Sequence, residues 1–191
     1  MHLKGHQGFT MIELLITIAV VSIMIASVPV VRGFAPVLEV NRGTRAMAQA
    51  LREARSLAVK NGNDVIVTFD VNSGVINLYS DGDFDGIQVA DMVRSYELSE
   101  FAGGLVFASP TTTGTDGHAI ASMVDFGGTH DPISLTFRPN GATRDPGILY
   151  LTHRKTSMPD LGRAVEVLAT GRVQSWRYNI NSSPGPWERF L

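Results

Sequence analysis

The hydrophobic pattern changes character twice along this chain. Residues 9–31 form an apolar run that contains one formal charge, Glu13. The basic residue Arg32 follows directly after the run. A run of this length is typical of a membrane-spanning helix, because about 20 apolar residues cross a hydrocarbon core of roughly 30 Å. The pattern becomes amphipathic from Val37, and after Asn61 it changes to short segments typical of strands.

The amphipathic segment predicts a second stretch of helix over residues 32–61. Its apolar side chains recur at i, i+3, i+4 and i+7 spacing and form one stripe, which consists of Met47, Ala50, Leu51, Ala54, Leu57 and Ala58. Asn61-Gly62 is a typical helix stop. Pro29 allows two interpretations, a helix that ends there or a continuous helix with a kink, and the second is preferred.

The rest of the chain predicts an antiparallel sheet structure of about seven or eight strands. The expected strands are Val65–Phe69, Val75–Tyr79, Val93–Leu98, Gly104–Ala108, Ile133–Arg138, Ile148–His153, Ala164–Thr170 and Arg172–Tyr178. Residues 109–131 are expected to form a long loop and residues 181–191 an irregular tail. The fold class is therefore α+β, with a long N-terminal helix packed on antiparallel sheets.

Composition and charge limit the possible functions. The chain has 191 residues, 44% hydrophobic content and no cysteine, so packing or a metal must stabilise an exported domain. Residues 62–131 contain one basic residue against eleven acidic residues, a net charge of −10. This acidic middle argues against a nucleic-acid clamp and suits a cation or a basic surface of another subunit.

Glu13 is the anomaly of the apolar run. A carboxylate inside a membrane span costs about 2.5 kcal/mol or more, so we expect a cationic partner from another chain. Lys4 favours a cytoplasmic N-terminus. The rival interpretation is an ordinary signal peptide cleaved near Ala26, but the run is long, contains Glu13 and lacks a good small-x-small site.

Residues 8–15, which read Gly-Phe-Thr-Met-Ile-Glu-Leu-Leu, resemble the class III signal of type IV pilins and type II secretion pseudopilins. The resemblance implies that a prepilin peptidase cleaves after Gly8 and that the new N-terminus, Phe9, is N-methylated. It also implies that Glu13 pairs with the N-terminal amine of a neighbouring subunit. A carboxylate one helical turn from the N-terminus can neutralise the N-terminal ammonium of a neighbouring chain that is staggered beside it.

The C-terminal half resembles the GspH/FimT subfamily. The residues that carry this resemblance are Phe137-Arg138-Pro139-Asn140-Gly141, Val165-Glu166-Val167 and Gly171-Arg172-Val173. The resemblance implies a minor pseudopilin of a type II secretion pseudopilus, and the alternative is a FimT-like minor pilin acting in pilus assembly or DNA uptake. The implied partners are other pseudopilins or pilins, the prepilin peptidase and an inner-membrane assembly platform.

The implied organisation has four parts. Residues 1–8 are a prepilin leader, 9–31 a transmembrane helix, 32–61 its amphipathic continuation and 62–191 a β-rich periplasmic domain. The protein is then a single-pass protein of the bacterial inner membrane, incorporated into a periplasmic pseudopilus or pilus.

A candidate calcium loop lies in the acidic middle. Asp81, Asp83 and Asp85 occupy alternate positions before Gly86, as in the first half of an EF-hand loop. Met92 stands where that loop needs a bidentate Glu, although Asp91 or Asp125 could substitute. An acidic, solvated turn explains the same residues without a metal.

Arg172 and Arg177 are candidates for nucleic-acid contact only under the alternative function. Arginines interleaved with Trp176 and Trp187 could hold a single strand. The family's G-R-x-R turn here lacks its second arginine, because Gln174 stands there. Edge-strand charges and buried indoles are the competing explanation.

Catalytic motifs are absent from the sequence. It has no G-x-S-x-G, H-E-x-x-H or P-loop, and no spacing singles out a grouping of its five His residues. We therefore predict a structural subunit that is a substrate of an enzyme and is not an enzyme itself.

Overall fold

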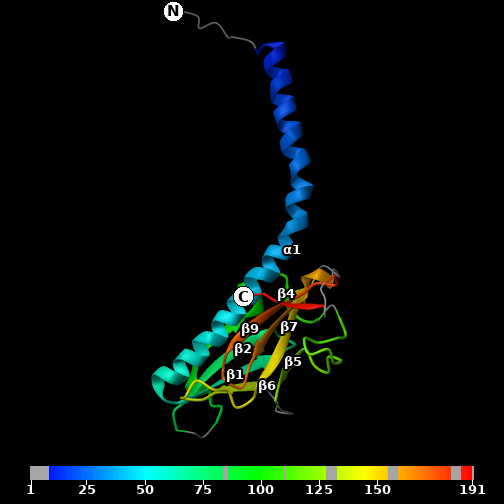
Figure 1. Ribbon diagram of the computed structural model, residues 1–191. Helices are drawn as coiled ribbons and strands as arrows, with labels where there is room; N and C mark the ends of the chain where they lie inside the picture. The colour runs from blue at the N-terminus through cyan, green and yellow to red at the C-terminus, as the bar shows by residue number, and fades with distance from the viewer. Residues whose placement is uncertain are drawn as a thin grey trace, which may run out of the picture. The chain divides into compact units, whose positions relative to one another are not determined.

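The computed structural model describes residues 9–83, 86–109, 111–127, 133–154, 159–181 and 186–190, and for residues 25–34 and Pro159 the backbone alone. The α+β class is confirmed, since one long helix, α1 (Met11–Asn61), precedes two antiparallel sheets (Figure 1). The chain divides into two compact units, unit 1 (residues 1–35) and unit 2 (residues 36–191). Helix α1 contributes residues to both units.

Unit 1 consists, in its described part, of the N-terminal part of α1. The helix continues through Pro29 and does not end at this residue, so the continuous helix is observed, whereas the kink at Pro29 stays a prediction. The side chains of residues 25–31, which end the predicted membrane span, lie outside the described residues. No helix within the described residues combines the length and the apolar character needed to cross a membrane.

Unit 2 holds both sheets. The first sheet has the order β3-β2-β1-β6, with β1 (Asp64–Asp70), β2 (Val75–Asp81), β3 (Met92–Glu97) and β6 (Ile133–Phe137). The second has the order β10-β9-β8-β7-β4, with β5 also on β7; its strands are β4 (Leu105–Phe107), β5 (Val124–Phe126), β7 (Gly147–His153), β8 (Arg163–Val167), β9 (Val173–Tyr178) and β10 (Trp187–Arg189). Short helices are η1 (Val89–Asp91), α2 (Leu98–Phe101) and η2 (Pro159–Leu161).

The predicted strand number is slightly too low, because the described residues form ten strands. The two missed strands are β5, inside the predicted long loop, and β10, inside the predicted irregular tail. Each is only three residues long, too short to show a period-2 pattern against its Gly- or Pro-rich surroundings. Pairing with β7 and β9 defines these strands, and that pairing is a long-range property.

The main core joins the C-terminal part of α1 to both sheets. The predicted stripe packs into this core: Met47 and Ala54 are 0% exposed, Leu51 is 1% exposed, and Leu57 is partly buried. The sheets meet through Phe69 of β1, whose ring stacks on Phe126 of β5 with centroids 5.1 Å apart. Figure 1 shows this part of α1, coloured cyan, lying across the strands of unit 2.

A second, smaller cluster covers the other face of the second sheet. Along β7 the side chains alternate, so that Leu149 and Leu151 belong to the main core and Tyr150 belongs to this cluster. Tyr150 and Tyr178 both pack against Trp187 of β10. Trp187 Nε1 donates a hydrogen bond to the carbonyl oxygen of Thr113 at 2.9 Å, which fastens the tail to the long loop.

Candidate functional site

The start of α1 is capped by the threonine of the pilin-like motif. Thr10 Oγ1 accepts a hydrogen bond from the backbone N–H of Glu13 at 3.3 Å, and the Thr10 carbonyl accepts from Leu14. Thr10 and Glu13 have the Thr-x-x-Glu spacing of a capping box, and a carboxylate in the first turn interacts favourably with the helix dipole. This Thr-x-x-Glu spacing is the local sequence signal that indicates the cap. Gly8 lies outside the described residues.

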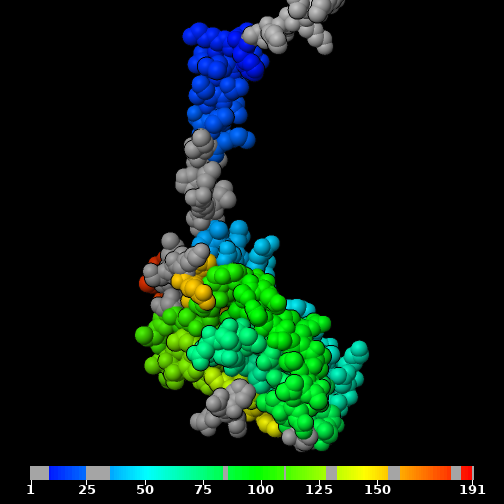
Figure 2. Space-filling view, turned by 180° about the vertical axis from the view of Figure 1, so that it is seen from behind, coloured from blue at the N-terminus to red at the C-terminus, as the bar shows by residue number. Residues whose placement is uncertain are grey.

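The helix surface of unit 1 is apolar and exposed on all sides. Every large hydrophobic side chain over residues 9–24 is at least half exposed, from Val20 at 50% to Met11 at 83%. These side chains make the blue surface in Figure 2. A helix that is hydrophobic all round is normally buried in a core, a membrane or an assembly.

The hydroxyl side chains of this part of the helix form hydrogen bonds with the backbone of the same helix. Thr17 Oγ1 donates to the Leu14 carbonyl and Ser22 Oγ to the Ile18 carbonyl, both at 2.8 Å. Such back-bonding removes hydroxyl groups from contact with apolar surroundings. Within the described residues no cation lies within ion-pair distance of the Glu13 side chain, so Glu13 stands out as the one charge on this surface.

The part of α1 in unit 2 is fastened to the sheets by polar contacts that the sequence did not predict. His153 Nε2 lies 3.2 Å from Glu39 Oε2 near the beginning of this part. Further along, Glu53 accepts hydrogen bonds from Arg94 at 2.7 Å and from the Tyr96 hydroxyl at 3.0 Å. A phenol is already protonated at neutral pH, and burial raises the pKa of Tyr96 further, so its hydroxyl acts as a donor there.

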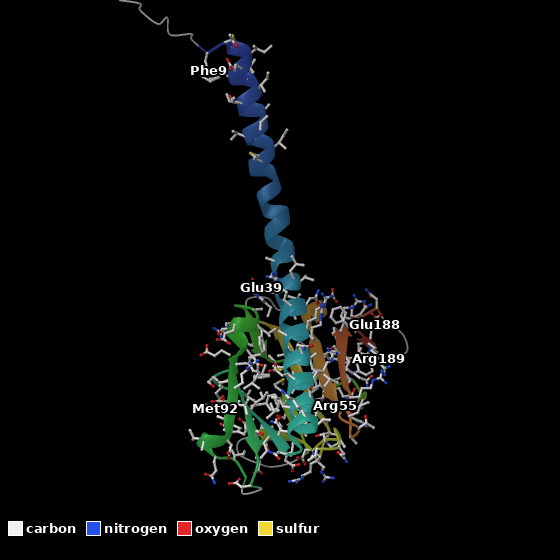
Figure 3. All side chains as sticks on the ribbon, turned by 90° about the vertical axis from the view of Figure 1, so that its left-hand side faces the viewer. Phe9, Glu39, Arg55, Met92, Glu188 and Arg189 are labelled. Atoms are coloured by element: carbon white, nitrogen blue, oxygen red, sulfur yellow. The ribbon has the colours of Figure 1, made fainter. Side chains whose placement is uncertain are left out.

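Arg55 explains the glycines of the subfamily motif. Its Nε donates to the Gly141 carbonyl at 2.8 Å and its Nη2 to the Thr170 carbonyl at 3.3 Å. Gly141 and Gly171 both have positive φ, at 78° and 72°. A Cβ atom on Gly171 would collide with the Gly141 carbonyl oxygen. The two turns therefore meet under Arg55, which Figure 3 labels on α1.

The candidate calcium loop is only partly described. Asp81 is 6% exposed, and no described group forms a hydrogen bond with its Oδ1. Asp83 is exposed and Asp85 lies outside the described residues. Among the residues that are described, no three acidic or His side chains converge on a point that could hold a metal. The calcium site stays a prediction.

The two candidate nucleic-acid residues lie apart. Arg172 precedes β9 and Arg177 is near its far end, so about 16 Å of extended strand separates them. Arg177 Nη2 forms an ion pair with Glu188 at 2.7 Å. The two indoles donate their N–H groups to Glu166 and to the Thr113 carbonyl, and Trp187 is buried. The structure does not bring these residues into one stacking groove.

Comparisons with known proteins agree with the N-terminal and C-terminal patterns. Residues 3–29 match the prokaryotic N-terminal methylation motif, and residues 43–171 match the type II transport protein GspH. No curated protein matches the chain. Among solved structures, the minor pseudopilin EpsH from the type 2 secretion system of Vibrio cholerae is 20% identical, with a TM-score of 0.48, over 72% of this chain and 95% of EpsH. The type IV minor pilin FimU of Pseudomonas aeruginosa is 16% identical, with a TM-score of 0.46, over 74% of this chain and 90% of FimU.

A capped apolar helix that opens on a methylation motif and continues onto antiparallel sheets defines a pilin-like structural subunit. The chain belongs to the family of the type II transport protein GspH, whose model covers most of it. Members of this class are pseudopilins or minor pilins, and they assemble with other pilin-like subunits. The resemblance to the GspH/FimT subfamily is thereby confirmed.

Proposed function

We propose that this protein is a minor pseudopilin of a type II secretion pseudopilus, assembled through the unit 1 part of α1. The observation that carries the proposal is the all-round exposed apolar surface of that helix over residues 9–24. Lipid covers this surface in the precursor, and the helices of other subunits cover it in the filament. Membership of the GspH family and the methylation motif support the same function.

Processing creates the partner that Glu13 requires. Prepilin peptidase cleaves the peptide bond between Gly8 and Phe9, which leaves a free amine on Phe9 for methylation. The Glu13 carboxylate of one subunit then pairs with this amine on the next. The other polar side chains described on this helix bond to their own backbone, so this ion pair sets the register between neighbouring helices.

The cellular arrangement follows from this chemistry. Residues 9–31 anchor the precursor in the inner membrane, where an assembly platform receives it, and unit 2 faces the periplasm. The chain acts as a structural subunit with no catalytic role. The family membership supports this role.

The first experiment tests processing. Gly8→Val introduces a branched side chain at the scissile bond and should abolish cleavage, whereas Gly8→Ala should slow it. Intact-mass measurement of the protein from cells reads the result directly. Normal removal of residues 1–8 from the Gly8→Val variant would contradict the proposal.

The second experiment tests pairing. Glu13→Val should leave insertion and cleavage intact and lower incorporation into filaments, since breaking a buried ion pair costs about 3 to 5 kcal/mol. Glu13→Gln, which keeps the size and removes the charge, should behave like Glu13→Val. Incorporation is measured as the ratio of filament to membrane protein by quantitative immunoblot. Wild-type incorporation of either variant would rule out the pairing role.

A further inference from the structure

A cavity of about 400 Å³ lies beside the beginning of the unit 2 part of α1. Val37 and Leu161 give it apolar walls, and its other lining residues are polar: Asp160, Arg163, Arg177, Tyr178 and Asn179. Leu161 is 1% exposed and Arg163 is 3% exposed, so these two residues form the buried floor of the cavity, whereas Asp160 and Arg177 lie at its exposed rim. No part of the proposed processing or helix pairing uses this cavity.

Arg163 is held on one side by neutral groups only. Its Nε donates to Asn41 Oδ1 at 3.0 Å, and its Nη1 donates to the carbonyl oxygens of Asp160 and Gly162, both at 2.8 Å. The ring of Phe190 faces the guanidinium at 5.5 Å. Nη2, the remaining nitrogen, makes no hydrogen bond to any residue that the structure describes.

The charge of Arg163 has no carboxylate within ion-pair distance in the described parts of the chain. By contrast, the more exposed arginines Arg94, Arg144 and Arg177 each have one. Burial, with a smaller contribution from the positive Arg177, lowers the pKa of Arg163 to about 10, while Asp160 opposes the shift. The side chain therefore stays charged at neutral pH. A buried charge without a counter-ion is unfavourable, and an incoming anion would relieve it.

The neighbouring cation in the cavity is already neutralised. Arg177 pairs with Glu188 at 2.7 Å, and Asn179 Nδ2 donates to the other oxygen of Glu188 at 2.9 Å. Figure 3 labels Glu188 on β10. Asp160, which also lines the cavity, makes no ion pair with Arg163 within the described residues. Arg163 is thus the lining cation without a directly paired carboxylate in that part of the chain, and a single cation of this kind suits a monoanion better than a phosphate dianion. The apolar walls at Val37 and Leu161 suit the methylene groups of a glutamate side chain.

We propose that this cavity is a carboxylate-binding site, and that its occupant is an acidic side chain of a neighbouring subunit, held by the Nη2 edge of Arg163. The identity of the occupant as a neighbouring subunit rests on the proposed function, whereas the carboxylate chemistry does not. A charge-assisted hydrogen bond from arginine to carboxylate is among the strongest single contacts available at an interface.

The chemistry is tested on the full-length chain in detergent micelles with ¹⁵N-labelled arginine. The Nε–Hε resonance of Arg163, assigned by its disappearance in Arg163→Lys, should shift saturably with N-acetylglutamate N-methylamide. The neutral N-acetylglutamine N-methylamide should give no shift. Equal shifts with both probes, or no shift with either, would overturn the proposal. Tighter saturation by inorganic phosphate would overturn the assignment to a carboxylate.

Two further variants keep the test independent of folding defects. Val37→Trp fills the cavity and leaves the hydrogen bonds of Arg163 in place. It should therefore lower the affinity for the glutamate probe at least tenfold, while the melting temperature stays unchanged. Leu38→Trp is the matched control, because Leu38 is 62% exposed and does not line the cavity, and it should bind like wild type. Asp160→Asn should keep or tighten binding. The site would be refuted if Asp160→Asn lost binding of the glutamate probe, or if Val37→Trp bound the probe as well as wild type does.

The occupant is tested by incorporation into filaments, with Gly8→Val as the baseline for no assembly. Val37→Trp should reduce incorporation while cleavage stays normal. If Val37→Trp assembles like wild type, the neighbouring-subunit occupant is wrong and the proposed function stands. If wild type itself fails to be cleaved or incorporated, the proposed function fails, and the probe titration still decides the carboxylate site.

Discussion

The two parts of α1 use one helix in opposite ways. Over residues 9–24 the large apolar side chains are at least half exposed on every side, and the hydroxyl groups bond to their own backbone. Over residues 36–61 one face of the helix carries a largely buried apolar stripe, and polar side chains such as Arg55 bond to the sheets and turns. The difference teaches that the second part completes a core within the chain, whereas the first has a surface suited to contacts outside it.

The difference has a physical origin in residue periodicity. A stripe at i, i+3, i+4 and i+7 spacing buries one face and leaves the other for charged residues such as Arg52. The N-terminal part has no polar face, and folding of the isolated chain leaves its apolar area in contact with solvent. Stability of unit 2 and assembly through unit 1 should therefore respond to different substitutions.

The same substitution in the two parts gives the largest expected contrast. Leu51→Ala should lower the free energy of unfolding by about 3 to 5 kcal/mol, because Leu51 is 1% exposed and the change leaves a cavity. Leu15→Ala, at a position 59% exposed, should change it by less than about 0.5 kcal/mol and should lower filament incorporation instead. Urea unfolding of the full chain in detergent, followed by tryptophan fluorescence, measures both. Equal destabilisation by the two variants would abolish the contrast.

The glycine turns under Arg55 give the next largest effect. Gly171→Ala should cost about 2 to 3 kcal/mol, because the residue has a φ of 72° and a Cβ there would collide with the Gly141 carbonyl. Gly62→Ala is the matched control: it has the same φ of 72°, but nothing lies within 4 Å of its Cβ position. It should cost about 1 kcal/mol, the backbone term alone. Similar values for the two variants would show that the close approach of the turns contributes nothing.

Much of the fold could be predicted because its signals are local. The stripe from Met47 to Ala58 and the stop at Asn61-Gly62 are encoded in short windows of sequence, and the structure has a helix and its end there. Strands β5 and β10 could not be predicted in the same way. Their three residues become strand by pairing with β7 and β9, and Trp187 is fixed by a loop 74 residues earlier in the chain.

The candidate functional residues also divide into those that local sequence signals indicate and those that depend on long-range contacts. The motif at residues 8–13 is a local signal, and the processing residues that it indicates stay a prediction, whereas no local signal indicates the partners of Arg55 and Arg163. Arg55 reads as a charge off the apolar stripe, and only the folded chain brings the Gly141 and Thr170 carbonyls, 86 and 115 residues away, to its side chain. Arg163 similarly reads as an ordinary residue at a strand edge, and its burial depends on Asn41 and Phe190 from distant segments.

Arg55 itself gives a smaller effect than the glycines. Arg55→Met should cost about 1 to 2 kcal/mol, because it removes two charge-assisted hydrogen bonds while keeping part of the aliphatic stem. Arg52→Met, one turn earlier and exposed, should stay within about 0.5 kcal/mol of wild type. The same urea experiment compares them. A loss in Arg52→Met equal to that in Arg55→Met would mean that general helix charge, and not the contact with the turns, stabilises unit 2.

The smallest expected effect tests the first turn of the exposed part. Thr10→Ala removes the side-chain acceptor for the Glu13 N–H and should destabilise the helix start by about 0.5 to 1 kcal/mol, whereas Thr10→Ser should keep it. Amide hydrogen exchange of residues 11–14 in the full chain in micelles reports this locally. Faster exchange in Thr10→Ala, with an unchanged unfolding free energy of unit 2, would show that the threonine of the motif caps the assembly helix. Unchanged exchange would leave processing as the reason for that residue, and Glu13 would then act through its side chain alone.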